Sequence, residues 1–96
     1  MLYRANPYLT IDRFDDGTAI VVDAETHSTH IFNETALLIF EVSDGKSQNE
    51  IYEKYIQRLL EENFEVFNGH EINPVIKKDF DSIFLYMIRS NLLIDR

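Results

Sequence analysis

The feature that most constrains the fold is a change of hydrophobic period at Asn33. Before it, residues 8–32 form short alternating or continuously apolar runs separated by turn residues, which is typical of strands. After it, apolar residues recur every three or four positions, which is typical of helices. Asn33 is a good N-cap, because its side-chain oxygen can accept a hydrogen bond from an unpaired backbone N–H of the first turn. We therefore expect a small sheet whose last strand runs straight into a first helix.

Three strands are expected ahead of that junction. Residues 8–14, YLTIDRF, alternate imperfectly between apolar and polar, and residues 18–23, TAIVVD, are continuously apolar and should be the more buried strand. The Asp15-Asp16-Gly17 segment between them supplies the positive φ angles that tight hairpins require. Residues 28–32, STHIF, form a third short strand. Short strands with such connections predict an antiparallel meander.

Two helices are expected next. The first begins after Asn33 and is predicted to end at Asp44-Gly45, where glycine can adopt a left-handed conformation. The second begins at Ser47, because Ser47 and Glu50 match a capping box, and its pattern fades near residues 61–63. Residues 64–73 are expected to form a loop or a short irregular excursion.

The third helix is expected to begin at Asn73-Pro74 and to run to about Asn91, followed by a short final strand or a packed segment over residues 92–95. It is apolar over more than one face, since Leu85 and Tyr86 lie outside its main apolar stripe. One interpretation is that this extra surface contacts residues 64–73 or a partner in a homodimer. The other is that the helix lines pockets for a peptide that adds to the exposed edge of the third strand.

Composition excludes several classes of function. The chain has 96 residues, which predicts one domain, and 17 acidic against 9 basic residues give a net charge of −8. Proteins that bind nucleic acid or anionic membranes normally present a basic face, so neither partner is expected. The sequence has no cysteine, which rules out disulfides and thiolate chemistry. It shows no signal segment and no apolar run near the roughly 18 residues that a membrane span requires, so a cytoplasmic location is expected.

The sequence contains no convincing catalytic or metal-binding set. His27 and His30 lie three residues apart near Glu25, at the junction of a loop and a strand, whereas zincin histidines lie four apart on a helix. With three glycines in the whole chain, a phosphate-binding loop is not expected. We therefore expect no enzyme activity, no metal and no cofactor. A small enzyme using His30 and a carboxylate, and a winged-helix DNA-binding regulator, are the alternatives.

The stretch GTAIVVDAETHSTHIFNETALLIFEVSDGKSQNEI, residues 17–51, resembles the PqqD-like family of RiPP recognition elements. The resemblance covers residues 17–94, with Phe40 or a neighbour in the place of a common tryptophan and an unusually long segment between the second and third helices. Its matching positions are Phe32-Asn33, Thr35-Ala36, Leu38-Ile39, Asp44-Gly45, Ser47 and Glu50-Ile51, then Asp79, Phe80, Ile83, Phe84, Met87 and Asn91-Leu92.

The resemblance implies a winged-helix-like α+β fold, with a three-stranded antiparallel sheet followed by three helices, in a single domain over residues 1–96. It also implies that the protein binds the leader segment of a ribosomally made precursor peptide as a strand added to the third strand. The leader would then be presented to a separate modifying enzyme, either a radical SAM protein or a lasso-peptide leader peptidase. The expected peptide-binding residues are Ser28, Thr29, His30, Ile31 and Phe32 of the third strand and Phe80, Ile83, Phe84, Tyr86 and Met87 of the third helix.

Overall fold

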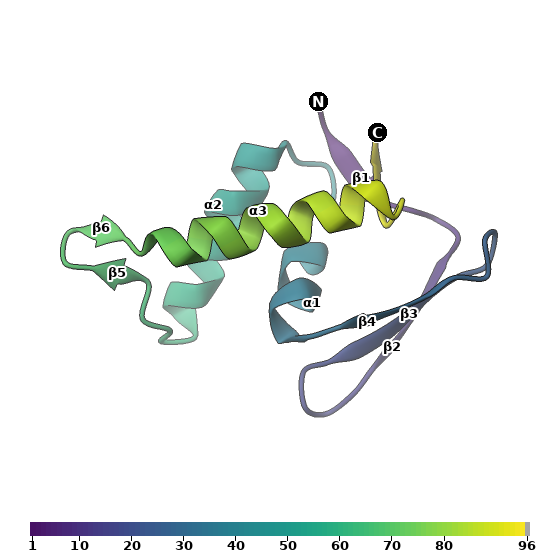
Figure 1. Ribbon diagram of the computed structural model, residues 1–96, viewed down its shortest axis with the longest axis horizontal. Coiled ribbons are helices and arrows are strands. Elements are labelled where there is room, and N and C mark those ends of the chain that lie inside the picture. Colours follow the sequence, from purple (N-terminus) through teal and green to yellow (C-terminus); the bar gives the residue numbers. More distant parts are fainter. Residues whose placement is uncertain (96) are drawn as a thin grey trace.

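The computed structural model describes residues 1–95 and has an α+β fold (Figure 1). The elements are β1 (Tyr3–Ala5), β2 (Leu9–Arg13), β3 (Ala19–Asp23), β4 (Thr29–Phe32), α1 (Glu34–Glu41), α2 (Gln48–Glu61), β5 (Phe67–Asn68), β6 (Glu71–Ile72), α3 (Pro74–Arg89) and β7 (Leu93–Asp95). The antiparallel sheet β2-β3-β4 and the three helices confirm the expected fold class, and the arrangement is compatible with a winged-helix-like fold.

The sheet is buried on one face only. Ala19, Val21 and Asp23 of the central strand β3 are buried, while Ile20 and Val22 between them are half-buried. Successive side chains of a strand point to opposite faces, so this alternation identifies the face that packs on the helices. The register places Ile11, Val21 and His30 side by side across the three strands, and so assigns His30 to the helix-facing side.

The predicted hairpin between β2 and β3 is confirmed. Asp16 accepts hydrogen bonds from the Thr18 hydroxyl at 2.6 Å and from the Thr18 backbone N–H at 3.0 Å. The bond from the Thr18 hydroxyl, and to a smaller extent the bond from its backbone N–H, hold the pKa of the Asp16 carboxyl below its usual range. Gly17 has φ +87°, a left-handed conformation that favours glycine.

The three predicted helix starts are also confirmed. Asn33 Oδ1 accepts the Ala36 backbone N–H at 2.8 Å and begins α1. Ser47 and Glu50 form the reciprocal capping box of α2. For α3, the Asn73 side chain accepts the backbone N–H of Val75 at 3.1 Å, with proline at the first helical position. Each cap satisfies a backbone donor that the first turn would leave unpaired.

The predicted end of α1 is wrong by three residues. The helix ends at Glu41, with Val42 as its C-cap, before the Asp44-Gly45 segment. Gly45 is left-handed, with φ +73°, but it serves a different purpose. Its N–H donates to the Tyr3 carbonyl at 2.8 Å, and the Tyr3 N–H donates to the carbonyl of Lys46 at 2.9 Å. Gly45 thus turns the chain onto β1 rather than ending α1.

Two short strand pairs complete the described chain. Residues 64–73, expected as a loop or irregular excursion, contain the hairpin β5–β6, whose turn includes Gly69 at φ +72°. For residues 92–95, where a short strand or a packed segment was expected, the structure shows the strand β7, which pairs with β1. Strand β1 has no counterpart among the predictions, because three residues are too few to carry a periodic signal. Figure 1 shows the β5–β6 hairpin beyond the start of α3 and the β1–β7 pair beside the end of α3.

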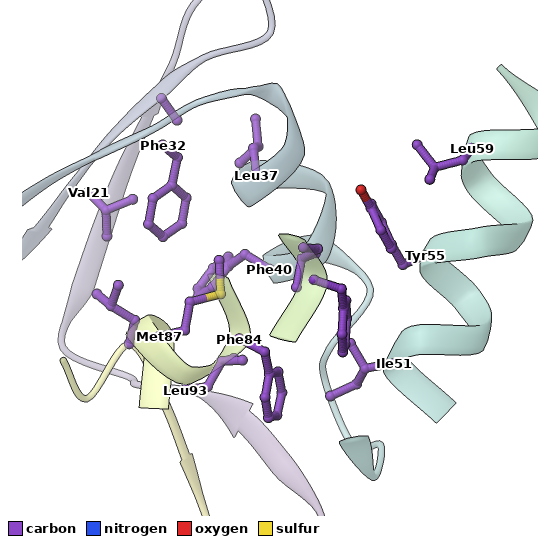
Figure 2. Packing of buried hydrophobic residues seen from close by; sticks show 14 of the residues in the cluster. Val21, Phe32, Leu37, Phe40, Ile51, Tyr55, Leu59, Phe84, Met87 and Leu93 are labelled. Atoms are coloured by element: carbon purple, nitrogen blue, oxygen red, sulfur yellow. The ribbon is translucent and has the colours of Figure 1, made fainter. Parts of the chain in front are cut away.

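The hydrophobic core packs β3 and β4 of the sheet, the three helices and β7 against one another (Figure 2). Phe80 and Phe84 of α3 stack with ring centroids 5.7 Å apart, and Phe80 also stacks on Tyr55 of α2 at 5.7 Å. Aromatic pairs of this kind add about 0.5–1.5 kcal/mol beyond the area they bury. The buried apolar residues are Ala19, Val21, Phe32, Leu37, Ile39, Phe40, Ile51, Tyr55, Leu59, Val66, Phe80, Phe84, Met87, Leu92 and Leu93.

Candidate functional site

Strand β4 is an outer strand of the sheet with one side unpaired. The order β2-β3-β4 places β3 on one side of β4 and, within residues 1–95, no strand on the other. Strand β2 is the opposite outer strand. Of these two outer strands, only β4 runs directly into a helix cap, and its side chains reach α3, as described below. An outer strand offers backbone N–H and C=O groups that another chain can pair with.

The register identifies the β4 backbone groups that face outward. The Asp23 N–H donates to the Ser28 carbonyl at 2.9 Å, which makes these two residues a hydrogen-bonded pair. Opposite residues in an antiparallel ladder alternate between bonded and non-bonded pairs. Val21 and His30 therefore form the next bonded pair, while the backbone groups of Thr29 and Ile31 face away from β3.

The β4 side chains alternate between the two faces of the sheet. Thr29 and Ile31 point away from the helices, and Ile31 is 79% exposed. His30 is half-buried on the helix-facing side, and Phe32 is fully buried there.

His30 links β4 to α3. Its Nδ1 lies 2.5 Å from the Tyr86 hydroxyl, and the two rings make an edge contact with centroids 5.8 Å apart. Its Nε2 lies 3.2 Å from the Ser28 hydroxyl, so the ring is held between two hydroxyl groups. Tyr86 remains 47% exposed, and Ile83 lies half-buried one turn earlier on α3. We call Ser28, Thr29, His30 and Ile31 with Ile83 and Tyr86 the β4–α3 surface.

Four of the expected peptide-binding residues lie in the core instead. Phe32, Phe80, Phe84 and Met87 are at most 3% exposed, so a bound peptide has no surface of theirs to contact. The expectation is corrected for these four, because they form the apolar stripes by which β4 and α3 pack on the rest of the chain. They support the β4–α3 surface from beneath.

Asp23 is a supporting residue that the sequence reasoning missed. It is buried, and its Oδ1 accepts the backbone N–H groups of Glu25 at 2.8 Å and Thr26 at 3.3 Å. These bonds shape the loop into β4, in which His27 takes φ +61°. An Asp at the end of an apolar strand is the available signal, because Asp side chains commonly bond the backbone two residues ahead.

The structure gives little support to the alternative sites. His27 is exposed in its loop while His30 contacts Tyr86, and within residues 1–95 no three acidic or histidine side chains gather as a metal site would require. On α3, Lys77 pairs with Asp81 at 3.0 Å and lies over the ring of Tyr52. This helix therefore presents no continuous basic stripe of the kind that a DNA-recognition helix uses. No helix in the described chain has the length and apolar character needed to cross a membrane.

Comparison with known proteins finds a likeness of fold. No protein-family model matches the sequence, and no curated protein matches it. Among solved structures, the chain is similar to TbiB1 in complex with the TbiA(beta) leader peptide. The superposition has a TM-score of 0.67 and covers 97% of this chain and 96% of that one, at 13% sequence identity. At that identity the likeness establishes a shared fold.

Proposed function

We propose that this protein binds the leader segment of a ribosomally synthesised precursor peptide as a fourth strand along β4. The observation that carries the proposal is the free edge of β4, where the backbone groups of Thr29 and Ile31 face away from β3 and His30 between them contacts Tyr86 of α3. Two further facts support it. The sequence resembles the RiPP recognition elements, and a protein of the same fold, TbiB1, was solved with a leader peptide.

Strand addition accounts for affinity without catalytic groups. Each backbone hydrogen bond contributes roughly 0.5–1.5 kcal/mol net, and one buried apolar side chain contributes roughly 1.5–3 kcal/mol. Four such bonds and one or two anchors reach about −8 kcal/mol, which corresponds to micromolar binding. Tyr86 and Ile83 are the surfaces on which an apolar leader side chain would lie.

The protein would hold the leader and present the core peptide to a separate modifying enzyme. The resemblance favours a radical SAM enzyme or a lasso-peptide leader peptidase as that partner. The chemistry would then belong to the partner, and this chain would contribute binding and orientation alone.

The direct test is an NMR titration of labelled protein with the leader of a precursor encoded near its gene. The backbone amides of Thr29 and Ile31 should shift and become protected from hydrogen exchange, because they gain partners. The His30 amide should change less, since it already faces β3. Shifts that cluster on α2 instead would overturn strand addition on β4.

A matched pair of variants tests the anchor. Tyr86→Ala should weaken leader binding about tenfold, because burying an aromatic side chain contributes roughly 1.5–3 kcal/mol. Leu85→Ala is the control, since Leu85 is 46% exposed, close to the 47% of Tyr86, and occupies the next position on the helix. Calorimetric titration measures both affinities, and melting temperatures verify folding. Equal losses in the two variants would remove Tyr86 from the site.

Salt-dependent binding to duplex DNA, if observed, would favour the alternative of a winged-helix DNA-binding regulator instead.

A further inference from the structure

A concave site lies away from the β4–α3 surface. It is a pocket of about 390 Å³ that draws its walls from α1, from the second half of α2, from the segment after it and from the start of α3. Its apolar side includes Leu37 and Leu38 of α1, Leu59 of α2 and Ile76 of α3. Phe64, beside them, is 53% exposed, although it is a large apolar side chain. None of the residues that define the β4–α3 surface lines this pocket.

The rim of the pocket is acidic. Four carboxylates line it, from Glu34, Glu41, Glu62 and Glu65, against the single guanidinium of Arg58. Glu41 is already paired with Arg13 at 3.2 Å. The other three carboxylates form no ion pair with any residue in the range 1–95. An apolar site with unneutralised carboxylates around it attracts a ligand that is both cationic and apolar.

Tyr55 supplies a polar group in the wall of the pocket. Its side chain is 4% exposed, and its hydroxyl makes no hydrogen bond to the described residues 1–95. Figure 2 shows the hydroxyl at the end of the ring that points toward Leu37 and Leu59. Burial, with smaller contributions from Asp79 and Tyr52, raises the pKa of Tyr55, so the hydroxyl keeps its proton at neutral pH. No buried side-chain polar atom of residues 1–95 lacks a partner, so this hydroxyl is not sealed in the core but opens onto the pocket, where it is free to donate to a ligand.

We propose that this pocket docks a basic, apolar segment of a partner protein, separately from the leader site. An apolar side chain of the segment would occupy the space beside Phe64, its lysine or arginine side chains would pair with the free glutamates, and a backbone carbonyl would accept the Tyr55 hydroxyl. The partner and a peptide on β4 can bind together, because the two sites share no residue. This proposal does not depend on what the β4 edge binds.

The first test uses two blocked pentapeptides, one alternating arginine with leucine and one with glutamate in place of each arginine. In NMR titrations of the whole protein, the cationic peptide should shift the amides of Thr35, Leu38, Glu62 and Phe64, while the amides of β4 stay unchanged. The acidic peptide should have no effect. The proposal is overturned if the cationic peptide leaves these amides unmoved, or if the acidic peptide moves them equally.

Variants then separate the site from the overall negative charge. Neutralising the rim with Glu34→Gln, Glu62→Gln and Glu65→Gln should weaken the cationic peptide about fivefold or more, as expected for three partly exposed ion pairs. The control neutralises three exposed carboxylates elsewhere, with Glu25→Gln, Asp44→Asn and Asp95→Asn, and removes the same total charge. Equal weakening by the two triple variants would mean that bulk charge attracts the peptide, and would overturn the site.

A third variant tests the hydroxyl alone. Tyr55→Phe keeps the ring that stacks on Phe80 and removes the donor, so it should weaken the cationic peptide about threefold. Unchanged affinity would remove the hydrogen bond from the proposal, and a lowered melting temperature would show that the hydroxyl serves the fold instead.

Discussion

At the scale of a single residue, two separate constraints require glycine at position 17. Its φ of +87° is a conformation that other residues adopt only at a cost of about 1–2 kcal/mol. A Cβ on Gly17 would also lie 2.6 Å from Cγ of Glu34, which is closer than real Cβ contacts. The first constraint comes from the hairpin, and the second from the start of α1.

The two constraints can be measured separately. Gly17→Ala should destabilise the protein by the cost of its φ plus about 0.5–1.5 kcal/mol for forcing Glu34 out of its rotamer. Gly69→Ala is the matched control, because Gly69 has φ +72° and nothing within 4 Å of the added Cβ. Urea unfolding of both variants gives the difference. Combining Gly17→Ala with Glu34→Ala should abolish the excess cost, and an excess that persists would place the strain elsewhere.

Residue-scale features were the most predictable part of this protein. Asn33, Ser47 and Asn73 each bond a backbone N–H two or three positions ahead, so the sequence alone contains both partners. The contact between His30 and Tyr86 joins residues 56 positions apart, and no local pattern contains it. The candidate site was therefore predictable as an edge and a helix, but not as this particular pair.

At the scale of elements, the start of α2 depends on the charge of Glu50. The Ser47 backbone N–H donates to the Glu50 carboxylate at 3.0 Å, and this bond, followed by the contact with the Ser47 side chain, lowers the pKa of Glu50 below its ordinary value of 4.5. A carboxyl with a lowered pKa stabilises the fold above its unfolded pKa, and this stabilisation is lost as the pH falls through the folded pKa.

Removing that charge should change the dependence of stability on pH. The wild-type free energy of unfolding should fall as the pH drops below 4.5, and Glu50→Gln should show a shallower fall because its amide does not titrate there. Ser47→Ala should give an intermediate slope, since the backbone N–H remains. Urea unfolding at a series of pH values measures these slopes, and identical slopes in all three proteins would exclude Glu50 as the cause.

The periodicity of α3 predicted its apolar stripe but not which of its faces meets the core and which lies beside β4. Its period predicted an apolar stripe correctly, but both Phe84 and Tyr86 were assigned to the peptide site. Phe84 packs in the core, and Tyr86 lies at the surface beside β4. Which face of a helix meets which neighbour depends on how α1 and α2 pack around it, and a single helix does not contain that information. The end of α1 was predicted wrongly for the same reason, because it depends on a distant segment. The Gly45 N–H donates to the carbonyl of Tyr3 instead of capping α1.

At the scale of the whole molecule, residues from the two ends of the described chain close the core together. Strand β1 pairs with β7, placing Tyr3 opposite Asp95, and the Tyr3 ring makes an edge contact with Phe84 at 5.2 Å. This pairing joins positions more than 85 residues apart, so the local sequence around Tyr3 contains no pattern that predicts it. It explains why β1 was absent from the predictions while β7 was anticipated only as one of two options.

Tyr3 should consequently matter for stability far from its own segment. Tyr3→Ala should lower the free energy of unfolding by about 1–3 kcal/mol, because it removes a half-buried ring from Phe84. It should also speed hydrogen exchange at the amides of β7. Tyr8→Ala is the control, since Tyr8 is 55% exposed and should cost less than about 0.5 kcal/mol. Equal effects of the two variants would show that β1 does not hold β7.

The β1–β7 pair also determines how the protein responds to mechanical force. Tyr3 and Asp95 lie directly opposite each other, followed by Arg4 with Ile94 and Ala5 with Leu93. Tension applied at these two ends loads one rung of the ladder at a time, as when a zipper is pulled open, instead of shearing all rungs together. The pair should therefore open at low force and peel away from Phe84 while β2, β3 and β4, which lie outside the loaded pair, stay intact. Force applied between Tyr3 and Asp95 would thus separate β1 from β7 before it loaded the β4 edge.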